Sequence, residues 1–383
     1  MAGIYTSNIL KWGFENCKGF GQLPGSKFHK LILEGLRNRN DEKAFCISNV
    51  PFRPSQITND LSFDESQENG VVYLYPSVFK KKIKNYVETL KYYKKALNRI
   101  ADEKSIIICD VLNASMCRAA LKYSRKKKTK CYGIVTDLAS FLPSDGTFRQ
   151  KIVKSYTMRN IRRFDGYIFL TEYMNKKINI YNKPYIVVEC VVEHYDTLIA
   201  KKECNNRIVY AGGINREYGV PELIEGFISA DLQGYELHLF GNGNCIDSYD
   251  FDYLKTKNVF LRGVVPNEIV VEEERKAILL VNPRPPHEEF TKYSFPSKNM
   301  EYMISGTPMI GYRLPGIPNE YFDKMFLFDG FGADSIADTF RKMFKNLKVT
   351  DFIKKGRYAQ KFVFENKNKD IVGKMIYDRL LKK

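Results

Sequence analysis

No stretch of the sequence approaches the roughly 20 consecutive apolar residues that a helix needs to cross a bilayer. This argues against an integral membrane protein. The first twenty residues also lack the apolar core of a secretory signal, because Lys11, Glu15 and Lys18 are spread among them. We therefore expect the protein to remain in the cytoplasm.

Metal-binding patterns are absent as well. None of the four histidines has metal-ligand spacing; they are His29, His194, His238 and His287. The eight cysteines form no C-x-x-C pair, and several lie in apolar runs, so we expect reduced, mostly buried thiols and no zinc site or disulfide framework. They are Cys17, Cys46, Cys109, Cys117, Cys131, Cys190, Cys204 and Cys245. We expect no metal and no other cofactor.

Length and charge set the general class. The chain has 383 residues, and single hydrophobic cores stop growing at about 250–300 residues, so two domains are expected. A hydrophobic content of 44% with 27% charged residues is typical of a globular protein. The formal net charge of +17 at pH 7 predicts an anionic partner or surface, such as nucleic acid, acidic lipid or a phosphorylated substrate.

Short β-branched or aromatic runs alternate with helix-period stretches in both halves. The predicted strands of the first half are 43–48, 71–75, 105–109, 131–136, 166–170 and 185–189, and its helices include 27–37, 79–100 and 114–127. The second half has strands 207–211, 235–240, 258–262, 277–281, 308–312 and 325–328, and helices 220–229 and 298–305. Such alternation predicts parallel sheets covered by helices. We expect an α/β protein with two Rossmann-like domains, 1–190 and 207–365, a linker at 191–206 and a last helix, 366–383, packing back on the first domain.

Residues 79–100 predict an amphipathic helix with a basic surface. Its apolar residues recur at helical spacing: Ile83, Tyr86, Val87, Leu90, Tyr93, Leu97 and Ile100. The remaining surface is crowded by Lys80, Lys81, Lys82, Lys84, Lys91, Lys94 and Lys95. Clustered lysines of this kind are typical of binding to anionic lipid, at about 1 kcal/mol per well-placed charge, although a solvated face of a core helix is the alternative. No nucleic-acid recognition motif accompanies the charge, so we expect a peripheral protein on the inner face of the plasma membrane and no nucleic-acid partner.

The segment 277–322 carries the most specific pattern. A buried strand ends at Asn282, an irregular loop follows, and Ser297 and Lys298 begin a helix. Helix N-termini at the carboxyl ends of parallel strands bind anions such as a diphosphate, and Lys298 would add a positive charge. Glu301, one turn further, is placed to accept hydrogen bonds from a sugar diol, and Gly306 ends the helix.

This segment resembles the retaining GT-B glycosyltransferases of glycosyltransferase family 4, especially the bacterial capsule and exopolysaccharide enzymes. In that family two glutamates are separated by seven residues ahead of a Gly-x-Pro turn. The second glutamate matches Glu301, which the resemblance assigns to the ribose of the nucleotide, and Tyr293 occupies the position of the first. Glu288 or Glu289 could replace that first glutamate only if the loop is rearranged.

Residues 209–227 look like the family's strand, glycine loop and first helix of the donor domain. Where the family often has an Arg and a Lys that touch the diphosphate, this chain has Gly213 and Tyr218, and Arg216 and Arg284 are candidates to supply the missing charge. Glycines after the next strand would allow close backbone approach to the ligand, and the family places residues 262–264 beside the base. The donor residues so implied are Gly212, Gly213, Arg216, Gly241, Gly243, Arg262, Val264, Arg284, Tyr293, Ser297, Lys298 and Glu301.

In the family the N-terminal domain binds the acceptor. The loop with Gly19, Gly21 and Gly25 stands where the family's glycine loop approaches the donor phosphate and the acceptor, or is a plain surface loop. The strand 131–136 brings Asp137 to its carboxyl end, where the family often has a histidine. Asp137 could orient or deprotonate an acceptor hydroxyl, or cap a turn. Asp137 and Glu301 are therefore the catalytic candidates.

The expected reaction transfers a hexose-type sugar from a nucleoside-diphosphate sugar to a hydroxyl of a glycan or lipid-linked acceptor in bacterial surface polysaccharide biosynthesis. Retention is implied by the family, and the helix dipole at Ser297 would stabilise the departing diphosphate without a metal. Asp250 and Asp252 formally make a D-x-D metal motif, which we interpret as a solvated loop. The alternatives are a sugar-nucleotide 2-epimerase of the same fold, a non-catalytic nucleic-acid-binding protein, and a degenerate transferase without turnover.

Overall fold

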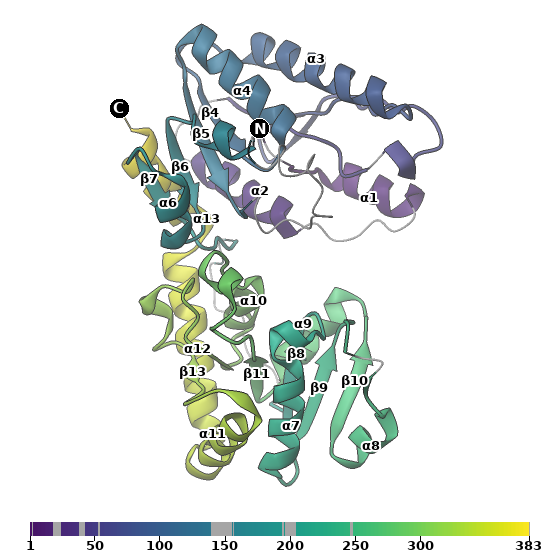
Figure 1. The fold of residues 1–383 in the computed structure, drawn as a ribbon, viewed down its shortest axis with the longest axis vertical. Coiled ribbons are helices and arrows are strands. Elements are labelled where there is room, and N and C mark those ends of the chain that lie inside the picture. Colours follow the sequence, from purple (N-terminus) through teal and green to yellow (C-terminus); the bar gives the residue numbers. More distant parts are fainter. Residues whose placement is uncertain are drawn as a thin grey trace. The chain divides into compact units, whose positions relative to one another are not determined.

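The computed structural model divides into two compact units, shown along the chain in Figure 1. Unit 1 comprises Met1–Glu193 and Asn368–Lys383, and unit 2 comprises His194–Lys367. The residues that the structure describes are 1, 3–17, 24–37, 43–52, 54–138, 155, 157–193, 195, 204–245 and 248–382. Each unit has its own sheets and its own core, and both are of the predicted α/β class.

Unit 1 contains two small sheets. The first has the order β1-β3-β2, with β1 and β3 parallel and β2 antiparallel, and is formed by β1 (Ala44–Ile47), β2 (Ser66–Glu68) and β3 (Val71–Leu74). The second is parallel throughout, in the order β4 (Ile106–Asp110), β5 (Lys130–Val135), β6 (Gly166–Phe169) and β7 (Tyr185–Val187). The helices include α1 (Ser7–Asn16), α2 (Pro24–Arg37), α3 (Lys82–Ile100), α4 (Ala114–Lys127) and α6 (Glu172–Ile178).

The C-terminal segment packs on unit 1, as predicted. Helix α13 (Lys369–Ile376) lies against α2, and Val372 and Ile376 share a buried cluster with Leu31 and Ile32 of α2. The two helices meet at glycines, which lets their backbones come close together. A Cβ atom on Gly35 would lie 2.0 Å from the carbonyl oxygen of Lys369.

Unit 2 is built on one six-stranded parallel sheet in the order β10-β9-β8-β11-β12-β13. Its strands are β8 (Arg207–Ala211), β9 (Glu236–Phe240), β10 (Val259–Gly263), β11 (Leu279–Asn282), β12 (Met309–Gly311) and β13 (Phe326–Leu327). Its longer helices are α7 (Val220–Ala230), α8 (Phe251–Thr256), α9 (Asn267–Lys276), α10 (Ser297–Ser305), α11 (Gly332–Asn346) and α12 (Val349–Asn366). The central strands β8 and β11 are buried nearly throughout, as expected for a sheet with helices on both faces.

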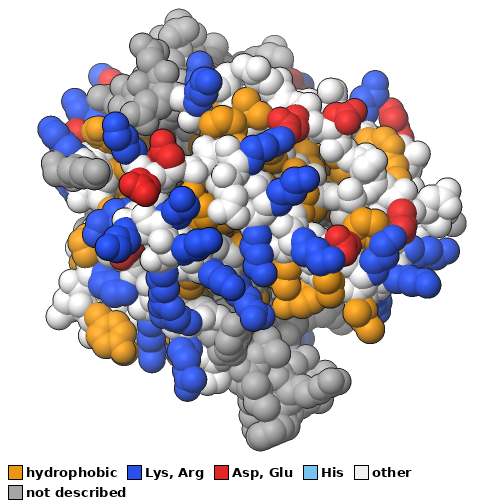
Figure 2. Space-filling view, turned by 90° about the horizontal axis from the view of Figure 1, so that it is seen from above, with side chains coloured by type: hydrophobic (Ala, Val, Ile, Leu, Met, Phe, Trp, Pro, Cys, Tyr) orange, Lys and Arg blue, Asp and Glu red, His pale blue; other side chains and the backbone are white. Residues whose placement is uncertain are grey.

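The apolar side of the basic helix α3 is buried only in part, although the sequence pattern runs along the whole helix. Its buried residues are Tyr93, Ala96 and Leu97, all in the C-terminal half. Ile83 is 83% exposed and Val87 41%, although both stand at apolar positions of the pattern. The apolar residues at the start of the helix therefore do not contact the core. Figure 2, seen from above the view of Figure 1, shows Lys and Arg side chains gathered over one end of the molecule with hydrophobic side chains between them.

The D-x-D segment is solvated, as interpreted, but it begins a helix and is not a loop. Asp250 is the N-cap of α8, and its Oδ1 accepts hydrogen bonds from the backbone amides of Asp252 at 3.0 Å and Tyr253 at 3.1 Å. Asp252 pairs with Lys255 in the first turn of the same helix. In the described parts of the chain no group of three or more His, Cys, Asp or Glu could hold a metal ion.

The cysteines behave as predicted. All of them are free, and only Cys204 is less than fully buried. Within the described residues, no helix combines the length and the apolar character needed to cross a membrane.

The contact between α2 and α13 predicts a stability effect that depends on position. Gly35→Ala should lower the free energy of unfolding by about 1–3 kcal/mol, because its methyl group would collide with the backbone of α13. Gly25→Ala in the same helix meets nothing within 4 Å and should leave stability unchanged or slightly raised. Urea unfolding of both variants measures the difference, and equal effects would contradict the close contact.

Candidate functional site

The carboxyl edge of the unit 2 sheet is the candidate site, because open α/β sheets bind ligands where the strand order reverses. The reversal lies between β8 and β11. The loops that follow β8, β9 and β11 therefore border the site. Helix α10 follows the third of these loops.

The glycines of the first two loops are required by the packing of one loop on the other. A Cβ atom on Gly241 would lie 1.9 Å from the carbonyl oxygen of Gly212, and one on Gly243 would lie 2.1 Å from that of Ile214. Gly241 also has a φ of 138°, which L side chains rarely adopt. Close contact between the loops thus explains these predicted donor residues before any ligand is considered.

Two buried side-chain contacts fix α10 beside the reversal point. The hydroxyl of Tyr302, which is fully buried, accepts a hydrogen bond from the amide of Ala211 at 3.0 Å and lies 3.4 Å from its carbonyl oxygen, to which it donates. Asn282, at the end of β11, donates from Nδ2 to Oδ1 of Asn299 at 2.5 Å. The helix N-terminus at Ser297 is therefore held between the ends of β8 and β11.

Lys298 is paired with two carboxylates. Its Nζ lies 2.5 Å from Oε2 of Glu301 and 3.6 Å from Oε1 of Glu274 on α9. Glu274 is 1% exposed, and this oxygen has no hydrogen-bond partner among the described residues. No sequence signal points to Glu274, because residues 272–276 are all charged, as on a solvated helix face.

Burial and charge act in opposite directions on the protonation of this cluster. Burial is the larger effect at Glu274. It raises the pKa of Glu274 to about 7, against the opposing attraction of Lys298. For Lys298 burial favours the neutral form, but Glu274 and Glu301 outweigh it and raise its pKa above the usual value. Lys298 therefore stays charged and holds the carboxylate of Glu301 in place.

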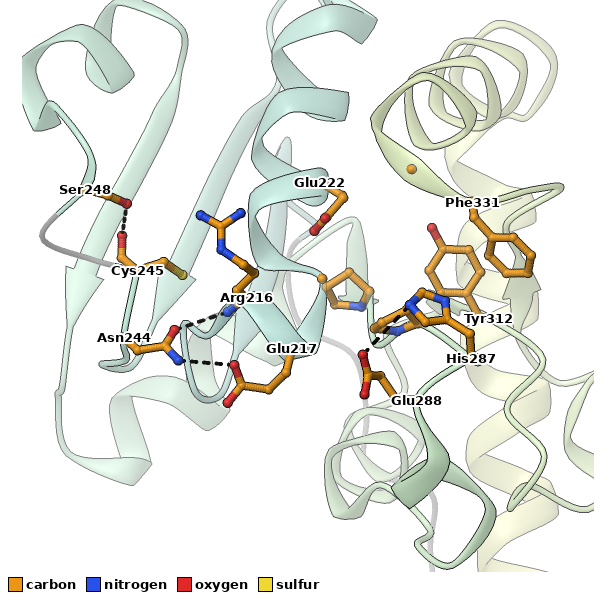
Figure 3. A pocket seen from close by; sticks show the side chains of 14 residues that line it. Arg216, Glu217, Glu222, Asn244, Cys245, Ser248, His287, Glu288, Tyr312 and Phe331 are labelled. Atoms are coloured by element: carbon orange, nitrogen blue, oxygen red, sulfur yellow. Dashed lines mark hydrogen bonds and ion pairs between the residues drawn. The ribbon is translucent and has the colours of Figure 1, made fainter.

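A cavity of about 820 Å³ opens at the same edge of the sheet (Figure 3). Its size falls within the range of small-molecule sites, roughly 300–1,000 Å³. Of the predicted donor residues only Arg216 lines it. The other ionisable lining side chains are Glu217, Glu222, His287 and Glu288, and aromatic rings are supplied by Tyr312 and Phe331. The buried Oε2 of Glu222 has no hydrogen-bond partner among the described residues.

Arg284 stacks on Tyr218, the residue that stands where the family resembled by the sequence often has a lysine. Its guanidinium carbon lies 4.7 Å from the ring centre of Tyr218 and 5.3 Å from that of Phe290. Burial lowers its pKa from the usual value, and its Nε has no hydrogen-bond partner within the described part of the chain. Gly213 adjoins the same ring, since a Cβ atom there would lie 3.1 Å from it. A partly buried cation with an unused donor thus stands beside the glycine loop.

Arg262 and Val264 lie at the end of β10. The Nε of Arg262 donates to Nδ1 of His238 at 3.2 Å, and Nε2 of His238 contacts Glu236 at 2.8 Å. Burial lowers the pKa of His238, which is 1% exposed, so the packed role predicted for it agrees with its position. Val264 is 78% exposed and available for contact with a ligand.

The loop after β11 contains Tyr293, which stands at the position of the family's first glutamate, and the two candidates to replace that glutamate, Glu288 and Glu289. Tyr293 follows the short 3-10 helix Glu289–Lys292 and does not line the cavity. Glu288 does line it, with its carboxylate 3.8 Å from His287, whereas Glu289 is exposed outside it. Of the two glutamates, Glu288 and not Glu289 therefore lies at the cavity.

The predicted residues of unit 1 form a separate group. Asp137 follows β5, its Oδ1 accepts from the amide of Leu138 at 2.7 Å, and burial raises its pKa. Gly25 is exposed in the first turn of α2. Gly19 and Gly21 lie outside the described residues.

The order β10-β9-β8-β11-β12-β13 is the Rossmann strand order, and a second α/β unit that receives the C-terminal helix completes the GT-B architecture. Solved structures agree. Sucrose-phosphate synthase from Thermosynechococcus elongatus matches with a TM-score of 0.64 and 12% identity, over 92% of this chain and 92% of its own. The lipopolysaccharide outer core galactosyltransferase WaaB matches with a TM-score of 0.59 and 14% identity, over 99% of this chain and 98% of its own.

A third similar structure, described as trehalose-6-phosphate from E. coli bound with UDP-2-fluoro glucose, gives a TM-score of 0.63 at 8% identity, over 95% of this chain and 98% of that one. At such identities the likeness establishes the fold. No protein-family model and no curated protein matches the sequence.

The buried Glu274 predicts a pH dependence of stability. Its folded-state pKa of about 7 lies above the usual 4.5, so the folded protein binds the extra proton and this stabilisation is lost as the pH rises towards and through 7. Glu274→Gln should reduce the fall in unfolding free energy between pH 5 and pH 8 by on the order of 2 kcal/mol. Glu268→Gln, exposed on the same helix, should not change it. Identical pH profiles for wild type and Glu274→Gln would contradict the assignment.

Proposed function

We propose that this chain is a glycosyltransferase that moves a sugar from a nucleoside-diphosphate sugar to a hydroxyl of a glycan or lipid-linked acceptor. The observation that carries the proposal is a large cavity lined by Arg216 at the reversal point of the unit 2 sheet, where Arg284 packs on Tyr218 after the β8 loop and α10 follows the β11 loop. Such an edge suits a nucleotide diphosphate because backbone amides and guanidinium groups neutralise its charge.

In this proposal the donor lies across the ends of β8, β9 and β11. Glu301, oriented by Lys298, accepts hydrogen bonds from the ribose. Arg284 and Arg216 supply the diphosphate contacts that Gly213 and Tyr218 cannot. The sugar enters the cavity, where Glu288 takes the role of the glutamate replaced by Tyr293. UDP-sugars are the first donors to test, because one similar structure is bound with UDP-2-fluoro glucose.

The chemistry needs stabilisation of negative charge on the departing diphosphate, and the α10 dipole and arginines would provide it without a metal. Asp137 is the proposed group that orients or deprotonates the acceptor hydroxyl, and its raised pKa favours proton transfer. Retention of configuration and a place in bacterial surface polysaccharide biosynthesis follow from the sequence resemblance to glycosyltransferase family 4.

We also propose that unit 1 binds an anionic membrane through α3. Ile83 and Val87 are exposed apolar side chains at the start of this helix, beside the exposed Lys80, Lys81 and Lys82. Apolar side chains next to a lysine cluster suit the boundary between lipid head groups and acyl chains. The cytoplasmic face of the plasma membrane offers such a surface.

Donor binding should be selective for one UDP-, GDP- or dTDP-sugar and independent of magnesium. Isothermal titration in EDTA should show that Glu301→Gln and Arg284→Met each weaken binding by about tenfold or more, since both remove a hydrogen-bonding partner of charged character. Glu289→Gln and Arg313→Met are the controls; Arg313 also stacks on a ring, that of Phe322, away from the cavity. Binding that needs magnesium, or equal losses with Arg284→Met and Arg313→Met, would overturn this assignment.

Membrane binding should depend on α3. Replacing Lys80, Lys81 and Lys82 together by Gln should lower sedimentation with anionic vesicles by roughly 10- to 100-fold in partition coefficient. Replacing Arg125, Lys126 and Lys127 removes the same charge from the exposed end of α4 and should have a smaller effect. Equal effects would show that diffuse charge, and not α3, attracts the vesicles.

A further inference from the structure

A second pocket, of about 230 Å³, lies in unit 1 at the carboxyl ends of parallel strands. It is bordered by residues that follow β1, β3 and β4 and by one side of α3. The lining residues are Asn49, Val50, Phe52, Pro76, Ser77, Val78, Asn85, Tyr86, Thr89, Tyr93, Asn113 and Ser115. This is the edge at which an open α/β sheet binds its ligand.

Among the described residues the lining carries no charged side chain, although the whole chain has a net charge of +17. Its polar groups are amides and hydroxyls. Oδ1 of Asn49 accepts from the hydroxyl of Tyr5 at 3.3 Å, that of Asn85 from the amide of Phe79 at 2.8 Å, and that of Asn113 from the amide of Met116 at 3.1 Å. The Nδ2 groups of these asparagines have no protein partner among the described residues, so each can donate to a ligand.

Aromatic surface completes the pocket. The ring of Tyr86 is 52% exposed, and Tyr93 below it is buried. An exposed ring beside amide donors suits a sugar, whose C–H face packs on the ring while its hydroxyls bind the amides. A phosphate would need cations, and the described residues of this lining include none. The volume lies below the roughly 300 Å³ of drug-sized sites, which suits a single ring.

We propose that this pocket binds a neutral sugar residue of the acceptor. The inference rests on the proposed glycosyltransferase function and identifies where unit 1 recognises its substrate. The exposed Lys80, Lys81 and Lys82 precede the pocket residues on α3, so an anionic carrier attached to the sugar would lie along them. The same sugar could be presented by a soluble glycan or by a lipid.

The test measures binding of methyl glycosides of glucose, galactose and N-acetylglucosamine to the full chain by saturation-transfer NMR. We expect at least one to bind, Tyr86→Ala to weaken that binding by roughly tenfold, and Tyr86→Phe to keep it. Tyr181→Ala is the matched control, since Tyr181 is an exposed tyrosine of unit 1, 66% accessible, that does not line the pocket. No binding by any glycoside, or equal effects of Tyr86→Ala and Tyr181→Ala, would overturn the inference.

Two further arms separate the possible outcomes. Tyr86→Ala should leave UDP-sugar binding unchanged. Glu301→Gln should weaken UDP-sugar binding and leave glycoside binding unchanged. If UDP-sugar binds but glycoside binding ignores Tyr86, only this inference fails; if no nucleotide-sugar binds, the proposed function fails. An octyl glycoside in anionic vesicles should bind more tightly than the methyl glycoside if the source is a lipid, and equally if it is a soluble glycan. For either source of the sugar, Tyr86→Ala must weaken glycoside binding if the inference holds.

Discussion

The candidate donor site depends on the buried contact between Tyr302 and Ala211. It joins α10, which follows β11, to the end of β8. Strands β8 and β11 are neighbours, and the order of the sheet reverses between them. Asn282 and Asn299 make a second link between β11 and the same helix. Because these groups are buried and mutually hydrogen-bonded, any displacement of α10 would leave polar atoms unsatisfied. The orientation of Glu301 and of the helix N-terminus follows from that constraint.

The parallel sheets could be predicted because their strands are apolar on both faces, as in 277–281 and 207–211. The strand Ser66–Glu68 could not, since it is short, polar and at a sheet edge. Spacing alone located Glu301 and Ser297 at the start of α10. It could not locate Glu274 or Glu222, or choose between Glu288 and Glu289, because charged residues in a sequence give no sign of whether the fold buries them or turns them into a cavity.

The distribution of charge separates surface from site. Among the described residues, the lining of the unit 1 pocket is uncharged, and that of the unit 2 cavity includes the acidic Glu217, Glu222 and Glu288 beside Arg216 and His287. The lysines of α3, in contrast, are exposed, and Figure 2 shows Lys and Arg side chains gathered on the surface. A basic surface with neutral or acidic pockets favours attraction to an extended anionic surface over the binding of a polyanion within the pockets. In our proposal the lysines of α3 attract the membrane, and Arg216 and Arg284 bind the diphosphate of the donor.

The departures from the family pattern need not mean lost activity, because the structure offers replacements for each missing group. Tyr218 lacks a positive charge but forms the platform on which the guanidinium of Arg284 rests, and Gly213 leaves room beside it. Tyr293 does not line the cavity, whereas Glu288 does. In the proposed function Arg284 supplies the cation near the glycine loop, and Glu288 supplies the carboxylate in the cavity. The Nε of the partly buried Arg284 lacks a partner among the described residues, an arrangement that costs stability unless a ligand uses the donor.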